Sequence, residues 1–409
     1  MAVESGIETE EFTLQKKAKM IVTEVYDKTP YIKKGHAYVP EDQMKGKKFG
    51  GTYTVYRPDP GKSRVVSKDD GKNGLKAQID QVQEVPYVIS MKAGMNDVEL
   101  DEWNKLCDIE SFKNEIVKVR ALNLARTIEK DAIDSTIWEA AQVGYIGELD
   151  LDAIGLGSAG LDEASVAGDR VTFINPKIGA KLAKKALGSF LQQEKAKELY
   201  NDKYLGTYAE TQVVTESLMP VVVADSSRTA TITLVEVSDA TGDKVIGFEP
   251  VVKLKNGSTA KEGDVFTISG LKLVDVNGIQ TNTDYTIVVG KNGSIPELRI
   301  TLEGENCNNA NAWMPKATAA GDKNGTYALT NGKTYDVVQT RTQSALGYDA
   351  YEFGKIPGTE MSKESIDGVS IQVYEGGNLG EFSSLVRMVV PFACGIPDAR
   401  ACVLSYIER

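Results

Sequence analysis

The sequence contains few of the residues on which most enzyme sites depend. Its 409 residues include 1 histidine, 4 cysteines and 3 tryptophans. A Ser-His-Asp or Cys-His system would have to use His36, which lies in a polar stretch beside Lys33, Lys34 and Gly35 with no nucleophile-elbow motif nearby. Such an enzyme is therefore not expected.

The cysteines have no C-x-x-C spacing, which argues against both a zinc site and a disulfide framework. We expect them to be buried thiols. They are Cys107, Cys307, Cys394 and Cys402.

Long apolar runs are also missing. No run approaches the roughly 18 residues of a membrane-spanning helix, and the N-terminus is acidic where a secretory signal would be basic and then apolar. The chain is therefore expected to be neither secreted nor inserted in a membrane. Its 47 basic and 58 acidic residues give a formal charge of -11. Binding to phosphates depends on Lys and Arg, so a chain with this negative charge is not expected to bind nucleic acid electrostatically.

One glycine-rich segment, residues 155–160, matches G-x-G-x-x-G. It follows an acidic segment instead of an apolar strand, so we do not expect dinucleotide binding and predict a small-residue loop over residues 155–168. The acidic residues around it lack the spacing of a calcium loop. They are Asp150, Asp152, Asp162 and Glu163. The sequence therefore predicts no catalytic residue, no cofactor, no metal and no enzymatic activity.

What the sequence does contain is a stretch of about thirty-five residues without Gly or Pro, from Asp108 to Val143. Its apolar residues recur at steps of three and four, so it predicts one long helix about 50 Å in length. The stripe lacks a strict seven-residue repeat, which favours a packed spine over a coiled coil. Gly144 and Gly147 are the predicted stop.

Two segments before this helix have little apolar surface of their own. Residues 12–28 predict a short amphipathic helix in a polar arm, which is expected either to be disordered or to fold against something else, a neighbouring copy being one candidate. Residues 51–57 and 78–91 alternate as two strands, joined by a charged segment rich in turn residues. A lone hairpin is marginal in water, so this one is expected to pack outside its own fold.

After the helix, residues 170–174 predict a strand, and Asn175-Pro176 predicts the N-cap and first turn of a second helix. From Val221 to Tyr335 short β-branched runs alternate with Asn-Gly turns, which is typical of a small antiparallel barrel or sandwich. Apolar strands after residue 335 resume the helix-bearing domain. The β-rich segment is therefore predicted to be an insertion.

The predicted fold class is α+β. The predicted divisions are an N-terminal arm at 1–50, an extended hairpin loop at 51–95, the spine helix and peripheral domain at 96–145, a first α/β part at 146–220, an inserted β-barrel domain at 221–335 and the return of the host domain at 336–409.

Candidate contacts between subunits are charged residues of the hairpin and the insert. The hairpin residues either lie in a solvated loop or pair with acidic surface on the next subunit. The candidates are Arg57, Lys62, Arg64, Lys68, Lys72, Lys76, Asp239, Asp243, Lys244 and Lys255.

These parts, in this order, resemble the major capsid proteins of tailed bacteriophages, with the Hong Kong ninety-seven type of shell fold. The sequence looks most like the coat proteins of the short-tailed Salmonella phages, which carry a β-barrel inserted at this position. The segments that carry the resemblance are residues 173–182, 206–220, 262–271 and 384–395.

The resemblance implies a homo-oligomeric shell of hexamers and pentamers in a virion, made in the host cytoplasm. It also implies a scaffolding protein and a portal protein as partners, and enclosed double-stranded DNA that is not bound by sequence. Two alternatives remain open: an encapsulin-like compartment, and a β-rich adhesin or carbohydrate-binding protein.

Overall fold

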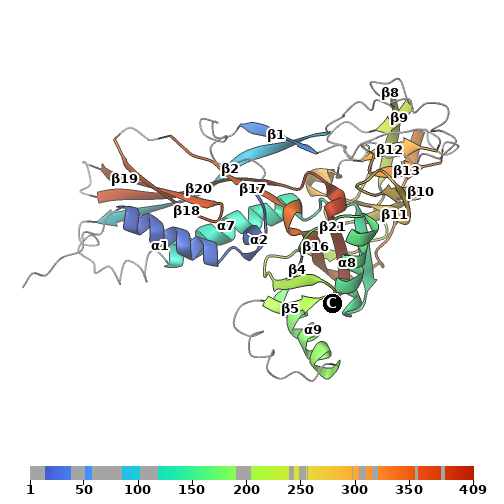
Figure 1. The fold of residues 1–409 in the computed structure, drawn as a ribbon, viewed down its shortest axis with the longest axis horizontal. Coiled ribbons are helices and arrows are strands. Elements are labelled where there is room, and N and C mark those ends of the chain that lie inside the picture. Colours follow the sequence, from blue (N-terminus) through green and yellow to red (C-terminus); the bar gives the residue numbers. More distant parts are fainter. Residues whose placement is uncertain are drawn as a thin grey trace, which may run out of the picture. The chain divides into compact units, whose positions relative to one another are not determined.

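The computed structural model describes residues 14–37, 51–57, 85–101, 118–189, 204–238, 244–247, 255, 257–296, 298–303, 310–315, 321–354, 358–378 and 383–409. The chain forms two units (Figure 1). Unit 1 comprises Met1–Tyr53, Ile89–Ala132 and Tyr348–Cys394, and unit 2 comprises Thr54–Val88, Ile133–Gly347 and Gly395–Arg409. No helix in the described ranges is long and apolar enough to cross a membrane.

A six-stranded sheet supplies the frame of unit 1. Its order is β1-β2-β20-β19-β18, and β17 pairs with β20. The strands are β1 (Thr52–Arg57), β2 (Val85–Asp101), β17 (Gly347–Ala350), β18 (Glu360–Ile366), β19 (Val369–Asn378) and β20 (Ser383–Gly395). β2 runs ten residues past the predicted end at Met91, because Met91 to Asp101 pair in register with Ala393 to Ser383 of β20.

The helix α1 (Leu14–Asp27) lies on this sheet and is followed by the short α2 (Pro30–Lys33). The apolar side of α1 is fully buried within the chain: Ala18, Ile21, Val22 and Val25. At its polar margin, Lys17 pairs with Glu375 of β19 at 2.9 Å and Gln15 donates to Glu364 of β18 at 3.1 Å. The amphipathic helix is confirmed. Of the predicted alternatives, folding against something else holds: the described helix is covered by β18 and β19 of the same chain and not by a neighbouring copy.

The predicted spine helix is α7 (Lys118–Thr136). Its apolar side packs closely on β2, since a Cβ placed on Gly94 would lie 2.4 Å from Cγ2 of Ile128 and 3.1 Å from Cδ1 of Leu124. Its predicted end at Val143 is wrong, because Gln142–Gly147 form strand β3, which pairs in parallel with β21 (Cys402–Glu408). Pairing with a strand distant in sequence outweighs local helix propensity there. Residues 108–117 lie outside the described residues.

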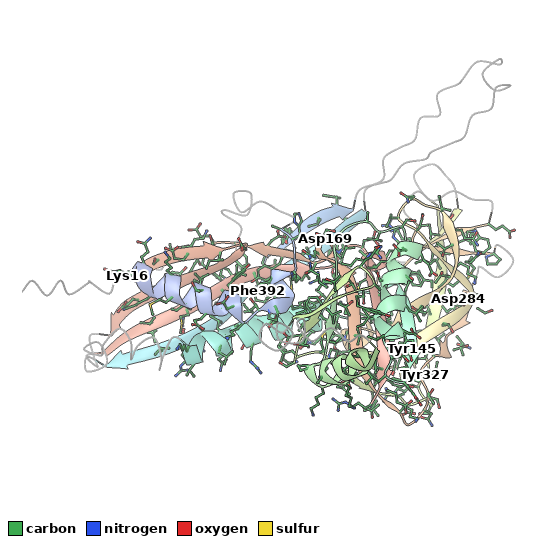
Figure 2. All side chains as sticks on the ribbon, turned by 60° about the horizontal axis from the view of Figure 1, so that its bottom comes forward. Lys16, Tyr145, Asp169, Asp284, Tyr327 and Phe392 are labelled. Atoms are coloured by element: carbon green, nitrogen blue, oxygen red, sulfur yellow. The ribbon has the colours of Figure 1, made fainter. Side chains whose placement is uncertain are left out.

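Unit 1 buries its core between this sheet and its two helices. Glu364 and Glu375 lie on the same face of the sheet as Gly94 in the printed registers, so α1 and α7 cover the same face. Phe392 of β20 lies in this interior and stacks on Tyr348 with ring centroids 5.9 Å apart, whereas Lys16 lies at the outer side of α1 (Figure 2).

A seven-stranded sheet organises unit 2, in the order β3-β21-β16-β4-β6-β5 with β7 also on β16. The remaining strands are β4 (Arg170–Ile174), β5 (Tyr204–Tyr208), β6 (Thr211–Thr215), β7 (Val221–Val223), β16 (Thr334–Thr342) and β21 (Cys402–Glu408). Strands from before residue 224 and after residue 333 therefore build one sheet. The chain leaves this sheet after β7 and returns to it at β16.

Two helices accompany this sheet. α9 (Pro176–Ser189) begins as predicted: the backbone N–H of Lys177 donates to Oδ1 of Asn175 at 3.0 Å. The predicted loop at residues 155–168 is wrong, because α8 (Asp152–Glu163) spans most of it. A Cβ on Gly157 would lie 2.6 Å from Oγ1 of Thr340. The glycines allow the helix to approach the sheet, which outweighs their low helix propensity.

The inserted segment forms an eight-stranded sheet ordered β11-β10-β13-β12-β9-β8-β14, with β15 on β10. The strands are β8 (Thr231–Ser238), β9 (Lys244–Gly247), β10 (Val265–Val274), β11 (Gln280–Val288), β12 (Arg299–Leu302), β13 (Ala312–Met314), β14 (Gly321–Asn324) and β15 (Thr326–Tyr327). Most pairs are antiparallel as predicted, but β12 and β13 are parallel. Short 3-10 turns occur at Lys291–Gly293, Gln343–Ala345 and Ala399–Ala401.

Candidate assembly surfaces

Three of the ten predicted contact residues lie in described parts of the chain. Arg57 is the last residue of β1 and Lys244 the first of β9. Lys255 is exposed and pairs with Asp322 of β14 within the same chain. The other seven predicted contacts lie outside the described residues: Lys62, Arg64, Lys68, Lys72, Lys76, Asp239 and Asp243.

The base of the predicted hairpin is anchored on one side and apolar on the other. Tyr53 of β1 is buried, and its hydroxyl donates to the carboxylate of Asp349. Further along the two strands, Tyr56 is 56% exposed and Val88 is 58% exposed. Such exposed apolar side chains on paired strands are a surface that another protein can cover.

The outer side of α7 is a second exposed surface. Val119 and Leu122 are exposed, and so are Arg120 and Arg126. The acidic residues of this part of the helix point elsewhere, because the buried Glu129 accepts from the backbone N–H of Tyr31 at 2.6 Å and Asp131 pairs with Lys92 at 2.7 Å. The outer side of α7 is therefore basic and partly apolar.

α8 presents the opposite charge. Its exposed residues include Asp152, Leu156, Asp162 and Glu163, and the helix contains no basic residue. Asp162 pairs with Arg170, whose hydrogen bond lowers the pKa of that carboxyl. Glu163 accepts from Oγ1 of Thr283 at 2.6 Å. The outer side of α8 is therefore acidic and, at Leu156, apolar.

Within unit 2, a buried arginine joins the host sheet to the insert. Nη1 of Arg400 donates to the carbonyl of Asp275 at 2.6 Å, and its Nη2 pairs with Asp398 at 2.7 Å. Burial alone would lower the pKa of Arg400, but Asp398, with Tyr285 and Asp275, outweighs burial and the pKa is raised. The side chain of Asp275 also accepts from Oγ of Ser165 at 2.8 Å. Asp275 thus contacts the host from both its backbone and its side chain.

A second joint lies at the start of β10. Nε1 of Trp138 donates to Glu262 at 2.7 Å, and the hydroxyl of Tyr406 donates to the carbonyl of Gly263 at 3.0 Å. The fully buried Asp264 pairs with Arg228 at 2.8 Å. Trp138 is buried, so it packs in the interior as well as donating the hydrogen bond to Glu262. The two joints fix the insert to its host.

The described residues include neither a metal-ligand group nor a reactive thiol. No group of three His, Cys, Asp or Glu side chains among them is placed to hold a metal ion. Cys394 and Cys402 are free, and burial raises the pKa of each thiol to about 12. Such thiols stay protonated at neutral pH and are poor nucleophiles.

Sequence reasoning missed both the Arg400 joint and the charged sides of α7 and α8. The turn at Asn277-Gly278 was visible, and an Asp two residues before the Asn is a common Asx-turn signal. Oδ1 of Asp275 indeed accepts from the backbone N–H groups of Asn277 and Ile279. Nothing local to Arg400 or Ser165 points to this turn, because their contacts join segments over a hundred residues apart.

No protein-family model and no curated protein matches the sequence. Several solved structures are similar to this chain over most of its length. The capsid structure of the cyanophage P-SCSP1u is 10% identical, with a TM-score of 0.40 over 91% of this chain and 89% of that chain. The capsid structure of the Helicobacter pylori bacteriophage KHP30 is 10% identical, with a TM-score of 0.40 over 93% and 91%. A chain of Mycobacterium phage Che8 is 10% identical, with a TM-score of 0.39 over 87% and 84%.

Proposed function

We propose that this chain is the major capsid protein of a tailed bacteriophage, which assembles into an icosahedral shell of hexamers and pentamers around double-stranded DNA. The observation that carries the proposal is the β1–β2 ladder: it is anchored through Tyr53, yet Tyr56 and Val88 are exposed in the single chain. A ladder of this kind reaches full burial only on another molecule.

The remaining surfaces support a repeated self-contact. A closed shell requires each copy to use two different, complementary surfaces, because a self-complementary patch alone yields only a dimer. The basic side of α7 and the acidic side of α8 are two such surfaces on one chain. Because the described residues hold no metal-ligand group and their two cysteine thiols are unreactive, the proposed role is structural and not catalytic.

The finer assignment is to the short-tailed phages whose coat protein carries an inserted barrel. β14 pairs with β8 and β15 pairs with β10, and Gly325 alone separates β14 from β15. These pairings support a closed barrel for residues 221–335. With this assignment we propose that the protein assembles with a scaffolding protein and a portal protein, and that it resides in the virion.

Expression of the chain with and without a scaffolding protein, followed by negative-stain microscopy, tests the function. We expect closed particles of uniform size, and DNA inside particles formed during infection. Particles that enclose an enzyme in place of DNA would indicate a nanocompartment. A chain that remains single at every concentration and binds a carbohydrate would indicate an adhesin and contradict the proposal.

A further inference from the structure

The outer side of α7 carries a regular stripe, defined here as the α7 stripe: Val119, Asn123, Arg126 and Lys130. These positions follow the spacing i, i+4, i+7 and i+11, so they lie along one side of the helix, and all four are exposed. Val119 is 60% exposed. Arg120 adds positive charge beside the stripe. Between Lys118 and Lys130 the helix has no exposed acidic residue.

α8 carries a stripe with the same spacing, the α8 stripe: Asp152, Leu156, Ala159 and Glu163. All four are exposed, and Leu156 is 45% exposed. Each stripe spans eleven residue steps, or about 17 Å at 1.5 Å per residue. The two stripes therefore match in length, and both mix charge with apolar surface.

Their chemistry is complementary. In a parallel alignment Lys130 meets Glu163, and in an antiparallel alignment it meets Asp152. In either alignment Asn123 and the aliphatic stem of Arg126 lie against Leu156 and Ala159. A folded protein partner is favoured over a polyanion, because Leu156 and Ala159 can cover the aliphatic stem of Arg126 and a phosphate backbone cannot. Charge complementarity of this kind fixes the register between two partners.

We infer that the α7 stripe of one copy docks on the α8 stripe of a second copy of this chain. The contact is head-to-tail, so each copy offers one stripe to each of two neighbours and the arrangement extends into a ring or shell. This inference rests on the proposed function, and it names helix faces that the predicted hairpin contacts do not include.

Crosslinking between singly substituted chains tests the contact. One chain carries Asn123→Cys and the other, with a size tag, carries Ala159→Cys. The two are co-assembled and treated with a short bismaleimide. We expect a crosslinked pair of one tagged and one untagged chain from the mixture only, and no such product from either chain alone or from the unsubstituted chain.

Charge reversal gives a second, independent readout. Arg126→Glu is expected to raise the concentration needed for assembly about tenfold, since it replaces a positive charge of the α7 stripe by a carboxylate that the acidic α8 stripe repels. Lys19→Glu, a matched reversal on the exposed side of α1, is expected to leave it within about twofold. Residue 126 faces Ala159 in the parallel alignment and Leu156 in the antiparallel one, so adding either Ala159→Lys or Leu156→Lys to Arg126→Glu is expected to restore most of the loss. The folded state of each variant is checked by circular dichroism before assembly.

Several outcomes would overturn the contact. Particles that form without the mixed crosslink contradict it and leave the proposed function standing. So does Arg126→Glu behaving like Lys19→Glu. If Arg126→Glu reduces retained DNA but not assembly, the α7 stripe faces a polyanion instead. A chain that stays single in every condition contradicts both the contact and the proposed function.

Discussion

The α1 helix and the base of the β1–β2 hairpin were expected to behave alike, and they do not. Both are short, and for both a neighbouring copy was a candidate partner. The apolar side of α1 is covered by β18 and β19 of its own chain, with Ile21 only 1% exposed, whereas Tyr56 and Val88 remain open. An amphipathic segment is therefore an assembly surface only where the rest of its chain offers no face to cover it.

The largest expected effect comes from weakening the packing of α1 on its own sheet. Ile21→Ala removes a fully buried side chain, so the free energy of unfolding of the single chain should fall by about 2–5 kcal/mol. Urea denaturation of the unassembled chain, followed by circular dichroism, measures the change. Lys19→Ala, exposed on the same helix, should change stability by less than about 0.5 kcal/mol. Equal effects of the two substitutions would contradict the docking of α1 on its own sheet.

Val88→Ser should show the opposite pattern. Because Val88 is already exposed in the single chain, its loss should change the free energy of unfolding by less than about 0.5 kcal/mol. Assembly should weaken by about a factor of ten, because a side chain buried only between copies contributes about 1.5–3 kcal/mol when fully covered. Light scattering against concentration measures assembly. If Val88→Ser destabilises the single chain and leaves assembly unchanged, the hairpin base is not an interface.

The smallest expected effect concerns an ion pair between β2 and β20 in unit 1. Arg387 donates two hydrogen bonds to Asp97, at 2.7 and 2.8 Å, and this pairing lowers the pKa of Asp97. A depressed carboxyl pKa stabilises the fold above the unfolded-state pKa near 4, and that stabilisation is lost as the pH falls through the folded-state pKa.

Because both side chains are more than a third exposed, Asp97→Asn should cost under about 1 kcal/mol at pH 7. The difference between the two chains should shrink as the pH falls below 4. Urea denaturation at pH 7 and pH 3.5 measures both values. A difference that persists unchanged at pH 3.5 would show that the pair contributes through shape and not through charge.

The sequence predicted best where the signal was local. Asn175-Pro176 marked the start of α9 because a capping side chain and a fixed φ act within one turn. The β-branched runs and Asn-Gly turns of the insert likewise depend on neighbouring residues. The parallel β12–β13 pair had no such local signal.

Prediction failed where packing across the sequence decided the outcome. Gly155, Gly157 and Gly160 indicated a loop, but close contact between α8 and the sheet makes that segment a helix. The predicted helix includes Gln142 and Val143, but pairing of Gln142–Gly147 with β21 makes these residues part of a strand. The partner of α1 lies more than three hundred residues away, on β18 and β19, beyond the reach of any local pattern. The sequence shows which charged residues the two helices contain. It assigns those of residues 152–163 to one side of a helix only once that segment is known to be helical.

Oxidative footprinting of Tyr56 in free and assembled chains tests most directly whether the hairpin base is covered by another copy. Tyr56 should be modified readily in the single chain and become protected on assembly, while Tyr31, already buried in unit 1, should be protected in both states. Assembled particles in which Tyr56 is modified as fast as in the single chain would contradict the account.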